Sequence, residues 1–278
     1  MLQKLLLLLF FLISFASLSQ SKIQKSEESL KKDSSSSYTT AQSSCSNSDD
    51  DESFGRVLFA ETIGRVFISI FAHTAYGILV ETPFEKNNPS SSAILTKQPY
   101  FKSNIGNYNY EWNNSSAVGR TTISSRYVFE NSTLNGNHLN ADLRFYNKLA
   151  LELNYLQLWE NHPNFGHHTL AIYTALAKYH RVRTKQFDAW WGIGTSYVDG
   201  NVDSLGFTIG LGAEIFFGKP ISLECNFNHT LLNDNSFNKF NALINYHINQ
   251  YKLNTGYESL KIGNQKFSTV SLGISLSF

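Results

Sequence analysis

Apolar and polar residues alternate one by one along most of the chain between residues 119 and 278. Successive side chains of a β-strand point to opposite faces, so this period of two predicts strands with one apolar and one polar face. About ten such runs follow one another, separated by turn residues. Only residues 169–182 are ambiguous, because both alternating sets carry apolar side chains there. The last run is the clearest, with apolar residues at Val270, Leu272, Ile274, Leu276 and Phe278.

A soluble β-sandwich also has alternating strands, but the runs in residues 119–278 favour an all-β, antiparallel transmembrane β-barrel of about ten strands. They extend over roughly 10–14 residues, longer than the usual 5–6 and long enough to cross a bilayer when tilted. Charged residues occupy the polar set, which suits a barrel lumen and not a sandwich core. We therefore predict a polar lumen network with these members: Arg126, Glu130, Asp142, Arg144, Glu152, Glu214, Glu224, Lys239, Lys252 and Glu258.

The connections between the runs fall alternately on two sides. Tight turns are expected on one side, at residues 147–148, 183–186, 218–220 and 249–250. Somewhat longer loops are expected on the other side, at residues 131–136, 160–168, 199–204, 233–236 and 262–266. An even number of strands, with both ends of the barrel on the short-turn side, is the arrangement of outer-membrane barrels.

The N-terminus has the features of a secretory signal peptide, which we place at residues 1–19. One early positive charge precedes an apolar run over residues 5–15. Ser17 and Ser19 then provide the small residues that a signal peptidase requires, so cleavage is expected after Ser19. The apolar run is too short for a spanning helix, which needs roughly 20 residues.

Three segments lie between this signal and the barrel. Residues 20–52 are rich in serine and charge, and they predict a disordered polar linker. Residues 53–82 have apolar side chains near helical spacing and predict an amphipathic helix against a membrane or the rest of the protein. A second transmembrane helix is the alternative, but charged or titratable residues interrupt it at Arg56, Glu61, Arg65 and His73. Residues 83–118 predict an irregular pre-barrel segment.

Composition and charge narrow the possible functions. The chain of 278 residues has 23 Lys and Arg against 22 Asp and Glu, and this net charge of +1 argues against a nucleic-acid partner. Its two cysteines, Cys45 and Cys225, exclude a disulfide framework and a cysteine-based zinc finger. No motif predicts a cofactor, and Cys45 lies too far from the apolar run for a lipoprotein signal.

The final strand, VSLGISLSF, ends in an aromatic residue, Phe278, and it follows a secretory signal and a series of antiparallel strands. In these features the chain resembles the small outer-membrane β-barrel proteins of Gram-negative bacteria. The resemblance covers residues 119–278. It implies outer-membrane lipid as the surroundings and a barrel-assembly machinery that reads Phe278 as its signal. The composition, the polar N-terminal tract and the segment GNYNYEW (residues 106–112) resemble flavobacterial-type members, which bring no known activity.

Candidates for catalysis or metal binding are few. A hydroxyl–histidine group at the barrel wall would require His229 with Ser236 and Asn238 of the next strand, but no acidic residue has matching parity. Three histidines in one loop could bind Zn²⁺ or Cu²⁺, yet solvated side chains are the simpler interpretation of His162, His167 and His168. The tryptophans are expected to be girdle or packing aromatics: Trp112, Trp159, Trp190 and Trp191.

These observations favour a non-catalytic outer-membrane barrel that serves in envelope structure, surface binding or narrow transport. With ten strands, long charged side chains would fill most of the lumen. The alternative is a barrel-wall enzyme that modifies lipid A or phospholipid. Neither the ligand nor the oligomeric state follows from the sequence.

Overall fold

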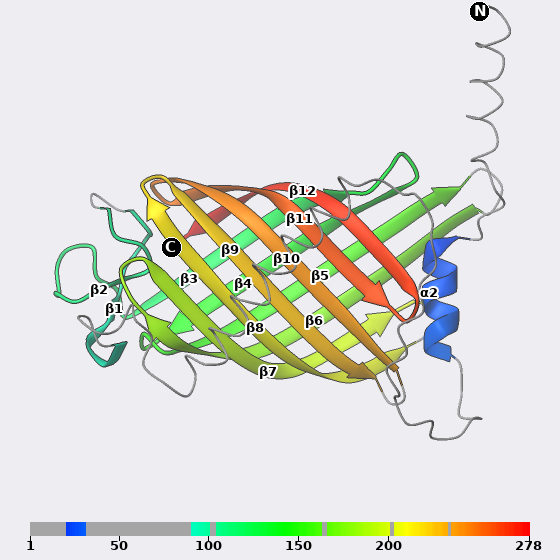
Figure 1. Cartoon of the computed structure of the whole chain (residues 1–278), viewed down its shortest axis with the longest axis horizontal. Helices are drawn as coiled ribbons and strands as arrows, with labels where there is room; N and C mark the ends of the chain where they lie inside the picture. The colour runs from blue at the N-terminus through cyan, green and yellow to red at the C-terminus, as the bar shows by residue number, and fades with distance from the viewer. Residues whose placement is uncertain (1–20, 32–89, 101–103, 163–165, 201–202, 233–234) are drawn as a thin grey trace, which may run out of the picture.

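The structure is a computed structural model that describes residues 21–31, 90–100, 104–162, 166–200, 203–232 and 235–278. Its body is a closed barrel of ten antiparallel strands, as predicted (Figure 1). Each strand pairs with its neighbour in sequence, and the last strand closes the barrel against the first. The strands are β3 (Gly119–Phe129), β4 (Leu134–Phe145), β5 (Leu149–His162), β6 (Gly166–Arg183), β7 (Phe187–Asp199), β8 (Ser204–Gly218), β9 (Ile221–Leu232), β10 (Asn235–Ile248), β11 (Tyr251–Ile262) and β12 (Gln265–Ser277).

The period of two in the sequence corresponds to lumen-facing and outward-facing positions. On β12, Ser271 and Ser275 are buried in the lumen, whereas Leu272 between them is 68% exposed on the outer wall. The ambiguous stretch 169–182 lies within β6, where Leu170 and Leu176 face the lumen. Apolar side chains therefore occur on both faces of β6, which explains why its sequence pattern is indecisive.

The connections are shorter than predicted on one side of the barrel. The tight turns occur as expected, for example between β10 and β11 at residues 249–250. On the opposite side, the predicted loop 262–266 reduces to residues 263–264, because β11 and β12 continue pairing to Ile262 and Gln265. The difference in length between the two sides is therefore small. We refer to the two sides as the turn end and the loop end.

A short segment before the barrel lies at the turn end. It contains η2 (Ser90–Ser92), β1 (Ile94–Leu95) and β2 (Tyr108–Asn109), and the two strands form a separate antiparallel sheet. Backbone hydrogen bonds attach it to the turns, since the amide of Gly106 donates to the carbonyl of Lys185 at 2.8 Å. This part of the predicted irregular segment 83–118 therefore carries short regular elements.

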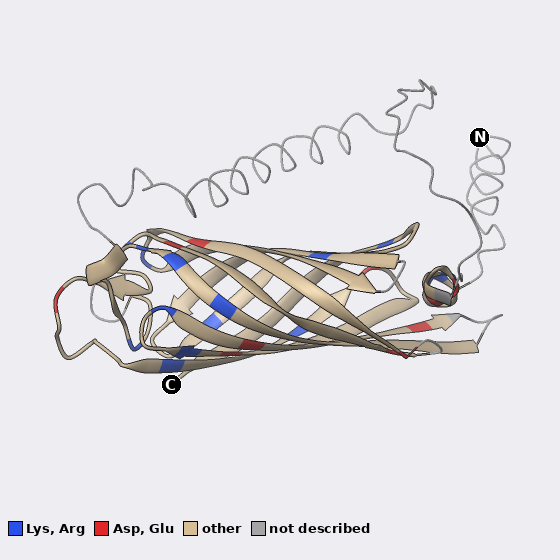
Figure 2. Ribbon diagram, turned by 90° about the horizontal axis from the view of Figure 1, so that it is seen from below, with Lys and Arg blue, Asp and Glu red and all other residues tan. Residues whose placement is uncertain are grey.

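Helix α2 (Lys22–Lys31) lies at the loop end, at the opposite end of the barrel from β1 and β2 (Figures 1 and 2). The prediction of disorder for residues 20–52 is wrong for this helix, because the barrel supplies a partner for its apolar and polar groups. Ile23 is fully buried and Leu30 packs against the same cluster. Residues 32–52, the predicted signal at 1–19 and the predicted amphipathic helix at 53–82 lie outside the described residues.

The outer wall of the barrel is apolar. Large apolar side chains are exposed along the outward positions, among them Ile123, Leu139, Leu153, Leu205, Ile244 and Leu272. Within the described part of the chain, no helix has the length and apolarity needed to cross a membrane.

Candidate functional site

The buried charged and polar side chains of the barrel lie in its lumen. At the loop end, however, the lumen is filled by apolar side chains. A cluster of buried side chains from nine strands fills this level: Val128, Leu134, Leu156, Leu158, Leu170, Ile172, Val198, Leu232, Phe237, Leu260, Ile262 and Phe267. Ile23 of α2 completes the cluster from above. The expectation of a polar lumen is therefore wrong at this level, because the inward positions near the loop end carry aliphatic and aromatic residues. Packing of this kind excludes water as a protein core does.

Polar contacts hold α2 over the apolar cluster. The carboxylate of Glu160 accepts hydrogen bonds from the Ser21 hydroxyl at 2.7 Å and from the Ile23 amide at 3.1 Å. A helix begins with unpaired amide groups, and a carboxylate satisfies them and favours the positive end of the helix dipole. Lys22 forms an ion pair of 2.7 Å with Glu130. Both acidic side chains come from the loop end of the barrel, so the barrel wall supplies the cap of its own covering helix.

Below the apolar cluster, the lumen contains paired charges. Glu258 accepts from Nε of Arg126 at 2.7 Å, and its second oxygen lies 2.6 Å from Nδ1 of His138. Lys239 lies on the other side of the imidazole, with its Nζ 2.8 Å from Nε2. These four side chains come from β3, β4, β10 and β11 and are at most 6% exposed. A buried charge is tolerated when it is paired and hydrogen-bonded, and Arg126 and Glu258 meet both conditions.

A second group of paired charges links β4 and β5 to β6 and β7 inside the lumen. Lys178 donates to Glu152 at 2.6 Å and also contacts Asp142. Arg144 donates to Asp188 at 2.7 Å. Lys178 also lies over the Trp190 ring, 4.7 Å from its centroid, a cation–π contact.

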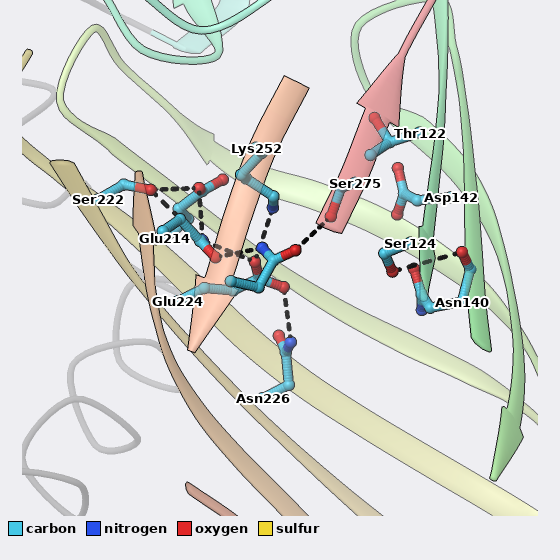
Figure 3. Close-up of polar contacts among 12 residues, drawn as sticks. Thr122, Ser124, Asn140, Asp142, Glu214, Ser222, Glu224, Asn226, Lys252 and Ser275 are labelled. Carbon is cyan, nitrogen blue, oxygen red and sulfur yellow. Dashed lines mark hydrogen bonds and ion pairs between the residues drawn. The ribbon is translucent and has the colours of Figure 1, made fainter. Parts of the chain in front are cut away.

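A third group lies on β8, β9 and β11. Lys252 donates to Glu224 at 3.2 Å, and the Asn226 amide donates to the same carboxylate at 2.9 Å. The Ser222 hydroxyl donates to Glu214 at 2.7 Å. Figure 3 shows these side chains converging inside the barrel. Because cations and anions are interleaved, the described lumen residues form no ring of one charge sign of the kind that selects ions.

The segment before the barrel closes the turn end of the lumen. The Asn107 amide donates to Asp188 at 2.8 Å and to Glu214 at 3.0 Å, while its oxygen accepts from Arg120 at 2.7 Å. Tyr108 is fully buried beside this group, and burial raises the pKa of its hydroxyl above the ordinary value, with the negative charge of Asp188 acting in the same direction. The tyrosine therefore stays neutral. Asn107 thus joins the turn-end segment to two lumen carboxylates.

The space that remains inside the lumen is small. A polar cavity of about 70 Å³ lies among the charged groups, lined by residues such as Arg120, Arg126 and Asp142. Each buried water needs roughly 10–15 Å³ of such volume, so the cavity has room for only a few water molecules. The apolar cluster fills the loop-end side of the lumen, and Asn107 of the turn-end segment lines the cavity on the other side.

The structure places nine of the ten predicted network residues in the lumen, whereas Glu130 lies at the loop end against Lys22. The predicted network did not include several further titratable residues of the lumen, among them Arg120, His138, Lys178, His180, Asp188 and His247. His138 and Asp188 have inward parity within regular runs, so parity alone could have identified them. Lys178 lies in the ambiguous stretch and carries no such signal.

The catalytic and metal candidates do not assemble into a site. His229 is on the outer wall opposite Asn238, and its Nδ1 lies 2.5 Å from the amide oxygen. His167 contacts the Asn161 side chain at the loop end. Among the described residues, no three histidine, cysteine or acidic side chains are grouped to hold a metal ion. Trp190, expected at a girdle or in packing, is buried in the lumen.

Comparison with known proteins adds little to these observations. No protein-family model matches the sequence, and no curated protein matches it either. Several solved structures are similar to the barrel, among them the following three. The KdgM porin in complex with disordered oligogalacturonate is 11% identical with a TM-score of 0.37, over 56% of this chain and 99% of the porin. An outer membrane channel from Pseudomonas putida F1 is 11% identical with a TM-score of 0.38, over 61% of this chain and 98% of the channel.

The outer membrane protein OprG from Pseudomonas aeruginosa is 14% identical with a TM-score of 0.32, over 58% of this chain and 96% of that protein. TM-scores this low support no conclusion about the role of this chain. The surroundings of the barrel follow instead from its own structure. Strand closure leaves no unpaired sheet edge, and an apolar wall surrounds a lumen of paired charges. Lipid requires such closure and such a wall. The chain is a transmembrane β-barrel of the outer-membrane type, with lipid around its apolar face.

Proposed function

We propose that this chain is a non-catalytic outer-membrane barrel with a closed lumen, which serves in envelope structure or surface binding. The observation that carries the proposal is the closure of the lumen at both ends. The apolar cluster and α2 fill the loop end, and Asn107 with its neighbours fills the turn end. Between them, the cavity of about 70 Å³ has room for only a few water molecules.

Narrow transport is the less favoured role. A solute would have to break the contacts of α2 with Glu160 and Glu130, separate the apolar cluster and displace Asn107. Lumen charges that are neutralised in pairs also offer no field that would attract an ion of one sign.

Export and assembly belong to the same proposal. The signal at residues 1–19 directs the chain to the secretory pathway, and the barrel-assembly machinery recognises the last strand with Phe278. The resemblance of the segment 106–112 to flavobacterial-type proteins supports a source in that group. Phe278 is 67% exposed on the outer wall, where a second protein can reach it before lipid surrounds the barrel.

Conductance of the purified full-length protein in planar lipid bilayers tests the closed lumen. We expect no stable channels, while a general porin prepared in the same way provides the positive control. Heat-modifiable gel migration shows that the inserted protein is folded. Stable unitary currents from the folded protein, or passage of small sugars in a liposome swelling assay, would reject closure and favour transport.

The lipid-modifying enzyme is the second candidate, and His229 on the outer wall is the residue that would carry it. The observed partner of its Nδ1 is the Asn238 amide and not a carboxylate, which leaves the base without an orienting acid. Lipid analysis of a deletion strain, complemented with the intact gene or with His229→Ala, separates the two functions. An acyl pattern that only the intact copy restores would favour the enzyme.

A further inference from the structure

An apolar groove lies on the outer wall of the barrel, across β3 to β7. Its volume is about 480 Å³, and almost all of its lining surface is apolar. We call it the outer groove and define it by Ile123, Ala141, Leu153, Tyr155, Tyr173 and Ala175. The groove is on the lipid side of the wall and is separate from the polar cavity of the lumen.

Small side chains occupy two outward positions of the groove, one on each side of Leu153. Ala141 pairs across the strands with Leu153, and Leu153 pairs with Ala175. Tyrosine side chains form one wall, since Tyr155 and Tyr173 are in ring contact with their centroids 4.8 Å apart. A hollow of this size on a lipid-facing wall is filled either by lipid or by another part of the protein.

The described residues on either side of segment 32–89 lie at opposite ends of the barrel. Helix α2 ends at Lys31, at the loop end, where the backbone of Leu30 accepts a hydrogen bond from Asn235. The next described residue, Ser90, is at the turn end, where its hydroxyl accepts from the amide of Arg183. Figures 1 and 2 show the two sites at opposite ends of the barrel. Residues 32–89 therefore connect one end of a membrane-spanning barrel to the other.

The lumen offers no passage for this connection. Its open volume of about 70 Å³ is far below that of a polypeptide, and its apolar end is filled. The connection must then cross the membrane outside the barrel. Backbone groups that cross lipid without internal hydrogen bonds are strongly disfavoured, so a crossing segment has to be helical.

The sequence of residues 54–81 is suited to such a crossing. A helix of this length measures about 42 Å, against a hydrocarbon core of about 30 Å. Four charged or titratable residues interrupt this segment. Glu61 and Arg65 are four residues apart, with the acidic residue first, so on a helix they face each other as a neutral pair. Arg56 lies two residues from the start of the segment, where its long side chain can reach the membrane surface, and His73 can cross as a neutral imidazole. The apolar positions on either side of Ile70 supply a face for the barrel wall.

We propose that residues 54–81 form a helix that crosses the membrane against the barrel and occupies the outer groove. The occupant is thus a segment of the same chain, and a lipid acyl chain is the competing occupant. This inference rests on the closed lumen of the proposed function, because an open lumen could contain the connection. The two are tested separately, since conductance reports on the lumen and cross-linking reports on the outer groove.

Cysteine cross-linking in outer membranes tests the proposal. The background carries Cys45→Ser and Cys225→Ser, and the groove position is Ala175→Cys near the middle of β6. Single cysteines placed in turn at residues 66–71 sample every face of the helix at mid-membrane depth. The matched control is Ala242→Cys, an outward alanine near the middle of β10 on the far wall. Oxidation is followed by mass spectrometry of disulfide-linked peptides.

We expect intramolecular disulfides between Ala175→Cys and one face of the scanned segment, repeating every three to four residues. The Ala242→Cys series should give none. Heat-modifiable migration shows that each variant is folded. If folded variants form no disulfide at Ala175→Cys, lipid fills the groove and the proposal is wrong. Equal yields at both alanines, or disulfides only between molecules, would also reject it.

Discussion

The Ser21 hydroxyl donates a 2.7 Å hydrogen bond to Glu160, 139 residues further along the chain. The same carboxylate accepts from the amides of Lys22 and Ile23 at the start of α2. One acidic side chain of the barrel rim thus caps the helix that covers the lumen. If the signal is cleaved after Ser19, this capped end lies next to the N-terminus of the mature protein.

Replacement of Glu160 by alanine should loosen α2. The loss of a helix cap costs roughly 0.5–2 kcal/mol, which corresponds to about 2–30-fold faster opening. Hydrogen–deuterium exchange of the amides in Lys22–Lys31 measures it. Glu28→Ala is the control, because Glu28 is exposed and, among the described residues, accepts a hydrogen bond from Gln24 within the helix and from no barrel residue. Unchanged exchange in Glu160→Ala would show that the cap does not hold the helix.

Removal of Glu258 should be among the most destabilising changes in the lumen. Glu258→Leu leaves Arg126 buried without its carboxylate, and breaking a buried ion pair costs roughly 3–5 kcal/mol. Urea unfolding of the protein in lipid vesicles measures the change. In the double variant Arg126→Met and Glu258→Leu, the loss should be smaller than the sum of the two single losses. Strict additivity would mean that the two residues do not interact.

The outer wall should reject charge at mid-membrane depth. Leu211 is an outward residue near the middle of β8, and Leu211→Arg should cost roughly 2–4 kcal/mol, whereas Leu211→Met should be tolerated. Heat-modifiable migration and urea unfolding report the loss. The neighbouring lumen position is also restricted, because a side chain at Gly210 would lie 2.7 Å from Asn228 and 3.1 Å from Trp190. Equal stability of Leu211→Arg and Leu211→Met would contradict a lipid-facing wall.

Phe278 allows assembly to be separated from stability. Its backbone exchanges hydrogen bonds of 2.8 and 2.9 Å with Thr121, so it helps to close the barrel between β12 and β3. Phe278→Ala keeps these backbone bonds but removes the aromatic ring. We expect it to slow insertion in cells while the purified variant refolds in detergent nearly as the original does. Deletion of Phe278 should impair both processes. Normal insertion of Phe278→Ala in cells would exclude the ring as an assembly signal.

The alternating pattern determined the barrel without help from tertiary contacts. A strand places every second side chain on the same face, so Leu272 and Ser271 could be assigned to opposite sides from their positions alone. The same rule predicted the strand number and the two ends at which the chain turns. The rule gave no clear assignment for residues 169–182 in β6. The outer face of this strand contacts lipid and its inner face contributes to the apolar cluster, so both faces are apolar.

Only the tertiary structure decided which inward residues meet. The alternating pattern predicts that Arg126 and Glu258 point into the lumen. Their contact depends on the closure of β12 against β3 and on the stagger of the strands around the barrel. Helix α2 was also beyond the sequence pattern, since its polar composition predicts disorder. Its stability comes from Glu160 and from the apolar cluster that Ile23 completes. The composition of a segment shows only how much apolar surface it can bury by itself. Helix α2 is instead buried against barrel residues that are more than a hundred positions away in the sequence.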